Sequence, residues 1–160
     1  MYEKMKETIA SFEEKIKSDK LKRMFDNCFY NALDTTIEYL DDGSVYMLTG
    51  DIPAMWLRDS SASVLQYIEF AKEDEDVFNL IKGLIKRQFF YISIDPYANS
   101  FNRDPNGHGH TQDEGERTPY TWERKFEIDS LCYPIWLIYK LYKVTGRKEI
   151  LDSEFVKTCK

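Results

Sequence analysis

Apolar residues recur every three or four positions along most of the chain, which predicts one helix after another. The first apolar stripe runs over 2–16 on an otherwise charged segment, and the second runs without a break over 21–40. Ser18 or Asp19 can cap the second helix, and the D-D-G sequence at 41–43 ends it. Two amphipathic helices are therefore expected in the first forty residues.

The middle of the chain continues the helical pattern after one short extended stretch. Residues 44–50 have a β-like composition and lie between two glycines. Apolar positions then return at helical spacing over 64–72 and over 77–92, with the charged turn K-E-D-E-D between them. A third and a fourth helix are expected there.

A fifth helix is expected from about Ser130 to the T-G at 145–146, and a sixth from about Ile150. Pro134 fits the fifth helix if Ser130 is its N-cap, because the first four N–H groups of a helix have no helical partner. Six helices predict an all-α chain. That chain fits either a bundle or half of a ring of twelve paired helices.

A long segment without helical periodicity, 95–123, separates the fourth and fifth helices. It contains three prolines, three glycines and both histidines of the chain. Loops of this length are uncommon in compact domains and are usually functional or disordered. The end of the loop is rich in rings and charges, which favours function, whereas its middle, over 103–118, is equally typical of a mobile segment.

Composition excludes several classes of protein. The net charge of −6 argues against a nucleic-acid-binding surface, which is basic. No window approaches the roughly 18 apolar residues of a membrane span. The first residues show no signal peptide, and Cys28, Cys132 and Cys159 are too far apart and too few for a disulfide framework. We expect a cytoplasmic protein in which Cys28 and Cys132 are small buried residues.

Motifs for cofactors and metals are weak or missing. No P-loop, Rossmann or G-x-S-x-G pattern occurs, so no cofactor is expected. His108 and His110 could supply two metal ligands, but spacing sets no third one. An H-x-H pair in a loop is more often solvated, and we expect no metal site.

Charged and aromatic residues meet in the segment D-I-P-A-M-W-L-R-D-S at 51–60. Trp56, Arg58 and Asp59 come just before an expected helix. One interpretation is structural: Asp59 caps the helix, Arg58 pairs with it at the surface, and Trp56 covers the core. The other is a carbohydrate site, in which the charged groups bind adjacent hydroxyls and the indole offers a flat apolar face.

A second segment, W-E-R-K-F-E-I-D-S-L-C-Y-P at 122–134, has the same arrangement. Trp122, Glu123, Glu127 and Asp129 precede or begin an apolar helix, so both groups are expected at the start of a helix. The nearby carboxylates make a phosphate site less attractive than a sugar site, because phosphate favours a glycine-rich backbone and isolated Lys.

These two segments, together with Y-A-N-S-F-N at 97–102, resemble the family 125 glycoside hydrolases. The resemblance implies an (α/α)6 toroid and an inverting, metal-independent exo-α-1,6-mannosidase. The W-L-R-D-S run is also similar to the W-x-R-D-S run of glucoamylase-type toroids, which implies that Arg58 and Asp59 bind the terminal mannose. Trp56, Trp122, Glu123, Glu127 and Asp129 are expected around the same sugar, together with Asn102.

Members of that family are longer, and the resemblance implies that the general acid and general base lie beyond Lys160. Residues 1–160 are then expected to form the N-terminal part, roughly half, of the toroid, with a mannose-containing oligosaccharide or glycan as partner. Glu123, Glu127 and Asp129 are catalytic candidates by residue type alone and are not assigned. The alternative is a non-catalytic, truncated chain that binds a terminal mannoside weakly. Its uncovered apolar helix faces are expected to favour self-association.

Overall fold

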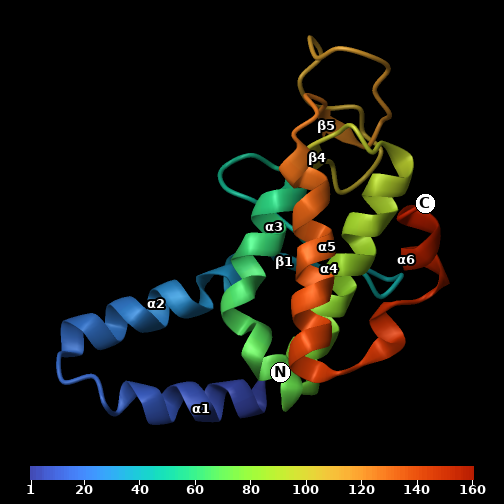
Figure 1. The fold of residues 1–160 in the computed structure, drawn as a ribbon. Helices are drawn as coiled ribbons and strands as arrows, with labels where there is room; N and C mark the ends of the chain where they lie inside the picture. The colour runs from blue at the N-terminus through green and yellow to red at the C-terminus, as the bar shows by residue number, and fades with distance from the viewer.

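The computed structural model describes all 160 residues, and three helical rods stand side by side in it (Figure 1). One rod is α4 (Glu75–Ile94), and α5 (Ile128–Thr145) packs beside it. The third rod consists of α3 (Leu57–Val64) and the 3₁₀ segment Leu65–Lys72, and it contacts both α4 and α5. The short α6 (Ser153–Thr158) packs on the opposite side of α4.

The buried core centres on α4, which contributes more buried residues than any other element. Its N-cap is Asp74, whose side chain accepts hydrogen bonds from the N–H groups of Asp76 and Val77. Apolar residues occupy nearly every position of α4 that faces a neighbour. This pattern is expected of a helix with partners on more than one side. The fourth expected helix, over 77–92, is thus confirmed, and it extends by two residues at each end.

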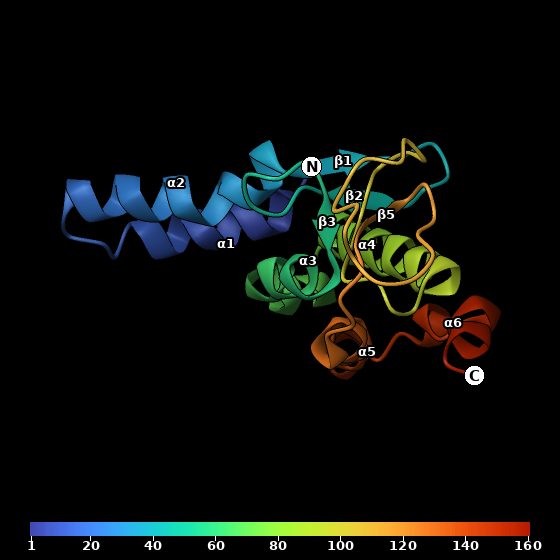
Figure 2. The same ribbon diagram turned by 90° about the horizontal axis from the view of Figure 1, so that it is seen from above.

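The first two helices, α1 (Glu3–Glu13) and α2 (Asp19–Thr35), project from the three rods as a helical hairpin (Figures 1 and 2). The base of α1 is attached to the start of α4, because Asp74 also accepts the N–H of Met5 at 3.0 Å. The side chain of Ser18 caps α2 as expected, accepting the N–H of Leu21.

The second helix is shorter than its apolar stripe predicted. It ends at Thr35, and the next residues form strand β1 (Ile37–Tyr39), which pairs antiparallel with β2 (Val45–Met47). The D-D-G sequence is therefore the turn of a β-hairpin and not the end of a helix. The physical reason is that Asp-Gly is a strong hairpin signal, and Gly43 has the positive φ of 75° that such a turn requires.

The long segment 95–123 is less irregular than expected. It contributes β4 (Ser100–Phe101) and β5 (Thr121–Glu123), which pair with β3 (Met55–Trp56) in an antiparallel sheet of order β3-β4-β5. The register places Met55 opposite Phe101. This small sheet joins the two segments that resemble carbohydrate-binding motifs, because β3 leads into α3 and β5 leads toward α5 (Figure 1).

The fifth helix begins earlier than predicted. Its first residue is Ile128 and its N-cap is Glu127, so Ser130 is not the cap. Pro134 is then the seventh residue of the helix, beyond the first four. Its missing N–H leaves the carbonyl of Ser130 without the usual helical donor. The interpretation of Pro134 as a first-turn residue was therefore wrong, and the error follows from the misplaced cap.

Two further expectations need correction. Cys28 and Cys132 are exposed and not buried, since they lie on the outer sides of α2 and α5. The fold is helix-rich and not all-α as predicted, because two small sheets accompany the six α-helices. None of these helices combines the length and the apolar character that crossing a membrane requires.

Candidate carbohydrate site

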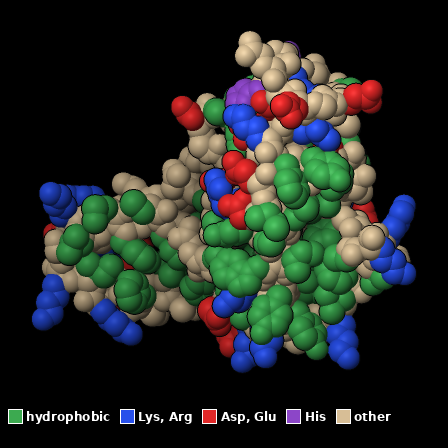
Figure 3. Space-filling model, turned by 45° about the horizontal axis from the view of Figure 1, so that its top comes forward, with side chains coloured by type: hydrophobic (Ala, Val, Ile, Leu, Met, Phe, Trp, Pro, Cys, Tyr) green, Lys and Arg blue, Asp and Glu red, His purple; other side chains and the backbone are tan.

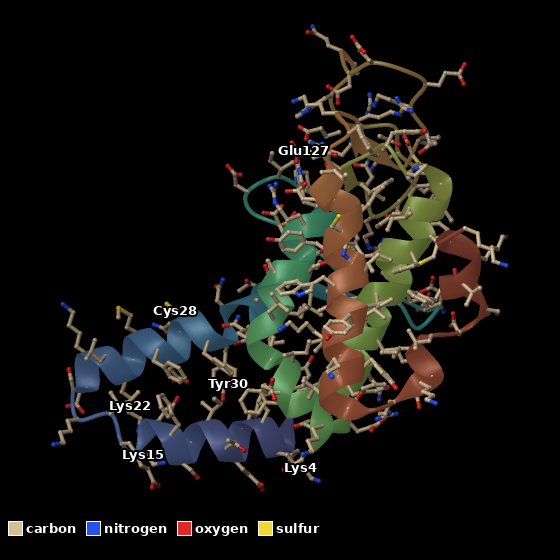
Figure 4. The ribbon with its side chains drawn as sticks, viewed as in Figure 1. Lys4, Lys15, Lys22, Cys28, Tyr30 and Glu127 are labelled. Atoms are coloured by element: carbon tan, nitrogen blue, oxygen red, sulfur yellow. The ribbon has the colours of Figure 1, made fainter.

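Arg58 lies at the start of α3, directly beside the start of α5, and three carboxylates surround its guanidinium. Its Nη1 donates a hydrogen bond to Asp129 at 2.9 Å and lies 3.5 Å from Glu127. Its Nη2 lies 3.5 Å from the Oδ2 of Asp59. Figure 4 shows Glu127 at the top of α5, next to α3. The two segments singled out in the sequence therefore meet at this point, which we call the Arg58 cluster (Arg58, Asp59, Glu127 and Asp129).

The helix that carries Arg58 begins two residues earlier than Asp59. Trp56 is the N-cap position of α3, and Asp59 lies in the first helical turn, where its charge is favourable. Asp59 is thus not the N-cap that the structural interpretation required. Its side chain remains about half exposed beside Arg58.

Asn99 connects the two helix starts, and sequence reasoning did not single it out. Its carbonyl accepts the N–H of Leu57, and its side-chain oxygen accepts the N–H of Glu127 at 3.0 Å. The same side-chain oxygen also accepts a hydrogen bond from the hydroxyl of Ser130 at 3.3 Å. Asn99 is completely buried. A fully buried amide that joins α3 and α5 fixes the position of Arg58 relative to its acidic partners.

The Arg58 cluster carries one positive and three negative formal charges and faces solvent. The four side chains are 38–47% exposed. The hydrogen bond to Asp129, followed by the charges of the neighbouring carboxylates, raises the pKa of Arg58 above its ordinary value. The Oδ1 of Asp129 is buried and has no hydrogen-bond partner. The half-exposed carboxylates of Asp59 and Glu127, beside a planar group of N–H donors, suit a ligand with several hydroxyl groups.

Glu123 is the only carboxylate of the expected site that is buried, at 8% exposure. It accepts hydrogen bonds from the side-chain amide of Asn99 at 3.2 Å and from Lys125 at 3.2 Å, and the Nδ1 of His110 lies 3.1 Å away. Through Asn99 it is linked to the Arg58 cluster, without touching Arg58. Glu123 therefore stabilises the site through its hydrogen bond with Asn99 in this structure.

Trp122 lies in β5, and Asn102 directly follows β4. The indole of Trp122 packs near His110, and its Nε1 is buried with no hydrogen-bond partner. Asn102 is buried, and its amide donates to the backbone carbonyl of His108 at 2.8 Å, so it holds the loop together. No group of three or more His, Cys, Asp or Glu side chains is arranged to hold a metal ion, and neither His108 nor His110 belongs to one.

The four residues of the Arg58 cluster line none of the cavities of about 540, 580, 400 and 330 Å³. The nearest in sequence is the cavity of about 540 Å³, which is lined by Lys125 and Phe126, immediately before Glu127.

The sequence of the chain is similar to those of known proteins. Residues 18–160 match the model of the family described as metal-independent alpha-mannosidase, GH125. The Meiotically up-regulated gene 157 protein of Schizosaccharomyces pombe is 33% identical, over 95% of this chain and 32% of its own length.

A solved structure of a metal-independent α-mannosidase from Streptococcus pneumoniae is similar in fold as well as in sequence. That structure is described as a non-productive substrate complex with α-1,6-mannobiose. It is 47% identical with a TM-score of 0.81, over 86% of this chain and 32% of that one. The chain thus spans about a third of the length of these relatives. Its sequence match over 18–160 shows that the chain belongs to glycoside hydrolase family 125, the metal-independent α-mannosidases.

Proposed function

We propose that this chain supplies the part of an exo-α-1,6-mannosidase that binds the terminal mannose of an oligosaccharide or glycan. The observation that carries the proposal is the Arg58 cluster: one guanidinium held among three half-exposed carboxylates at the adjoining starts of α3 and α5. Membership of family 125 and the α-1,6-mannobiose complex of the Streptococcus pneumoniae relative support mannose as the sugar.

The chemistry of the cluster fits the hydroxyl groups of one sugar ring. Each ionised carboxylate accepts hydrogen bonds from hydroxyls, and Arg58 has further N–H groups to donate to their oxygens. Hydrogen bonds to charged groups are stronger than neutral ones, so a few of them can orient a small ligand. Trp56, at the N-cap of α3, offers an apolar face for the C–H side of the ring.

We assign the Arg58 cluster to binding and place the general acid and general base outside residues 1–160. An inverting glycosidase needs two carboxyl groups about 6.5–9.5 Å apart, on opposite faces of the sugar. Glu127 and Asp129 both contact the same nitrogen of Arg58, so they lie on one side of any ligand bound there. In the proposed enzyme, an (α/α)6 toroid, one acid protonates the leaving oxygen while the other carboxylate activates water.

Binding and turnover measured on the same 160-residue protein test the proposal. We expect calorimetric heat on titration with methyl α-mannoside and no mannose release from α-1,6-mannobiose. Asp59→Ala and Arg58→Met should abolish the heat without lowering the melting temperature much, because exposed ion pairs contribute about 0–1 kcal/mol. Thr111→Ala, at an exposed loop position, is the matched control and should bind normally.

Each part of the proposal has its own contradicting result. Release of mannose by the 160-residue protein would disprove the placement of the acid and base elsewhere. Equal heat from the wild type and from the Arg58 and Asp59 variants would disprove the assignment of the Arg58 cluster.

A further inference from the structure

A cavity of about 400 Å³ lies between the turn of the β1–β2 hairpin, the middle of α4 and the residues that follow β4. Its volume is in the range of small-ligand sites, which is about 300–1,000 Å³. Two arginines, three aspartates and three aromatic residues make up all of its wall except Leu40. No residue of the Arg58 cluster lines it, and the proposed mannose site does not use it.

The cavity and the Arg58 cluster lie at opposite ends of the β3–β4 pair. The two strands are antiparallel, with Met55 opposite Phe101. Arg58 therefore follows β3 at one end of the pair, whereas Arg103 of the cavity follows β4 at the other end. The β1–β2 hairpin also lies on the side of α4 away from α5 (Figure 2). A sugar in this cavity is therefore not the direct neighbour of a sugar bound at Arg58.

Arg87, on α4, presents an unused donor group to the cavity. Only 8% of its side chain is exposed. Its Nε donates to the hydroxyl of Ser44 at 2.9 Å and its Nη2 donates to Asp42 at 3.1 Å, whereas its Nη1 makes no hydrogen bond within the chain. Buried polar groups are nearly always hydrogen-bonded. A nearly buried guanidinium in the wall of a cavity, with one nitrogen left over, is suited to a ligand oxygen.

The turn of the hairpin and the residues after β4 add charged groups of both signs. Asp41 is exposed and makes no side-chain hydrogen bond, so both of its carboxylate oxygens are free acceptors. Arg103 lies between Glu38, at 2.6 Å, and Asp104, at 2.7 Å. The two carboxylates orient the plane of the guanidinium. Donors and acceptors are therefore in place before a ligand arrives.

Three aromatic rings give the cavity an apolar surface. Phe90 and Tyr120 pack edge to face, with ring centroids 5.4 Å apart and an interplanar angle of 89°. Tyr39 is 48% exposed, and its hydroxyl is already paired with that of Tyr2. Tyr39 therefore offers a ligand its ring and not its hydroxyl. Rings beside Arg and Asp suit the C–H face and the hydroxyls of a sugar.

The charges of the wall select the class of ligand. Arg87 and Arg103 carry two positive charges, and the three aspartates carry three negative ones, so the formal sum is −1. The excess of carboxylates disfavours an anion such as phosphate, and the two guanidinium groups disfavour a metal ion. A neutral ligand with several hydroxyl groups fits both the charges and the rings.

We infer that this cavity is a second saccharide-binding site, which holds a part of a glycan remote from the sugar at the Arg58 cluster. The choice of a mannose-containing ligand rests on the proposed function, but the cavity itself does not depend on Arg58. The free N–H groups of Arg87 and the carboxylate of Asp41 bind hydroxyls of the sugar, while its C–H face packs on the ring of Tyr39. Two attachment points hold a long or branched glycan more tightly than either point alone.

The test uses the Arg58→Met chain, in which the first site is removed and the second remains. Amide shifts of this ¹⁵N-labelled chain should change at Tyr39–Asp42 and Arg103–Asp104 on titration with α-1,6-mannobiose. Asp41→Ala and Arg103→Ala, each added to Arg58→Met, should weaken this binding roughly tenfold, because a hydrogen bond to a charged group is lost. The matched controls Asp51→Ala and Arg23→Ala remove exposed charges that make no side-chain hydrogen bond, and they should leave the binding unchanged.

The outcomes separate this inference from the proposed function. Shift changes at the Arg58 cluster of the wild type, with none at the cavity of Arg58→Met, refute the second site and leave the proposed function standing. Changes at the cavity alone support the second site and refute the proposed function, and no change at either place refutes both. Tighter binding of inorganic phosphate than of mannobiose at the cavity refutes the saccharide assignment. Binding that neither Asp41→Ala nor Arg103→Ala weakens refutes it too.

Discussion

Arg87 has 8% of its side chain exposed, and Asp42 at 3.1 Å is the carboxylate that neutralises it. Its Nε also donates to the hydroxyl of Ser44 at 2.9 Å, and its guanidinium lies over the rings of Phe90 and Tyr91. Hydrogen bonds from Ser44 to Asp42, followed by the charge of Arg87, lower the pKa of Asp42 below its ordinary value. The side chain of Asp42, in the turn between β1 and β2, thus attaches that turn to Arg87 of α4.

Replacing Asp42 with Asn should lower the free energy of unfolding by about 1–3 kcal/mol near neutral pH, because a buried charge loses its partner. The folded-state pKa of Asp42 is lowered. The ionised carboxylate therefore stabilises the fold above its unfolded pKa of about 3.9, and the stabilisation is lost as the pH falls through the folded value. The difference between wild type and Asp42→Asn should shrink below about pH 4. Urea unfolding at a series of pH values measures it.

Asp41→Asn is the matched control, since Asp41 is exposed and makes no side-chain hydrogen bond. It should leave the stability and its pH dependence close to wild type. A constant difference between wild type and Asp42→Asn across the whole acid range would contradict the assigned role of Asp42.

At the residue scale, the sequence indicated the charged members of the Arg58 cluster but not Asn99, which connects them. Arg, Asp and Glu beside Trp are unusual enough to be noticed in a sequence. Asn99 is a common residue type in a turn-rich segment, and its five hydrogen bonds join residues that are far apart in the chain. No local pattern encodes such a set of contacts.

At the scale of elements, α4 and β2 approach closely at Gly83. A Cβ at this position would lie 2.7 Å from a methyl carbon of Val45 and 3.2 Å from the carbonyl of Gly43. Glycine within a helix normally costs about 0.5–1 kcal/mol relative to alanine. Here the side chain of Val45 is buried, so the neighbours of a new methyl group have little room to move.

We expect Gly83→Ala to destabilise the protein by about 1–3 kcal/mol, as overpacked cores do. Thermal unfolding of Gly83→Ala, Val45→Ala and the double variant measures the effect. The double variant should be more stable than the sum of the single effects predicts, because removing the valine methyl groups makes room for the methyl group introduced at position 83. Stabilisation by Gly83→Ala alone would contradict the close packing.

Periodicity predicted the long helices well and the short strands poorly. The apolar stripe of α4 is continuous and long, so its existence and extent followed from the pattern. The stripe over 21–40 also looked continuous, because Ile37 and Leu40 follow Leu33 at the helical spacings of four and three. Ile37 nevertheless begins strand β1. The sheet β3-β4-β5 was missed because it pairs two- and three-residue strands from distant parts of the chain.

At the scale of the whole molecule, hydrophobic side chains gather on one face (Figure 3). On the outer side of α5 the exposed apolar residues are Ile128, Ile135, Trp136 and Tyr139, which we call the α5 patch. On the α1–α2 hairpin they are Phe12, Leu21 and Met24. Large exposed apolar patches mark surfaces that other protein covers. The sequence analysis expected uncovered apolar helix faces of this kind.

We expect the purified chain to self-associate through the α5 patch, with a mean mass in sedimentation equilibrium that rises with protein concentration. Trp136→Lys should weaken the association, because it places a charge at the centre of the patch. Thr111→Lys introduces the same charge at an exposed loop position and should have no effect. A wild type that stays monomeric at all concentrations would contradict the expectation.

The central claim is that the Arg58 cluster binds a terminal mannose, and an NMR titration of the ¹⁵N-labelled chain with methyl α-mannoside tests it most directly. We predict that amide shifts change first at Trp56–Asp59 and at Glu127–Asp129, the two segments that meet around Arg58. These changes should disappear in Arg58→Met. Shift changes confined to other parts of the surface, or none at saturating sugar, would contradict the claim.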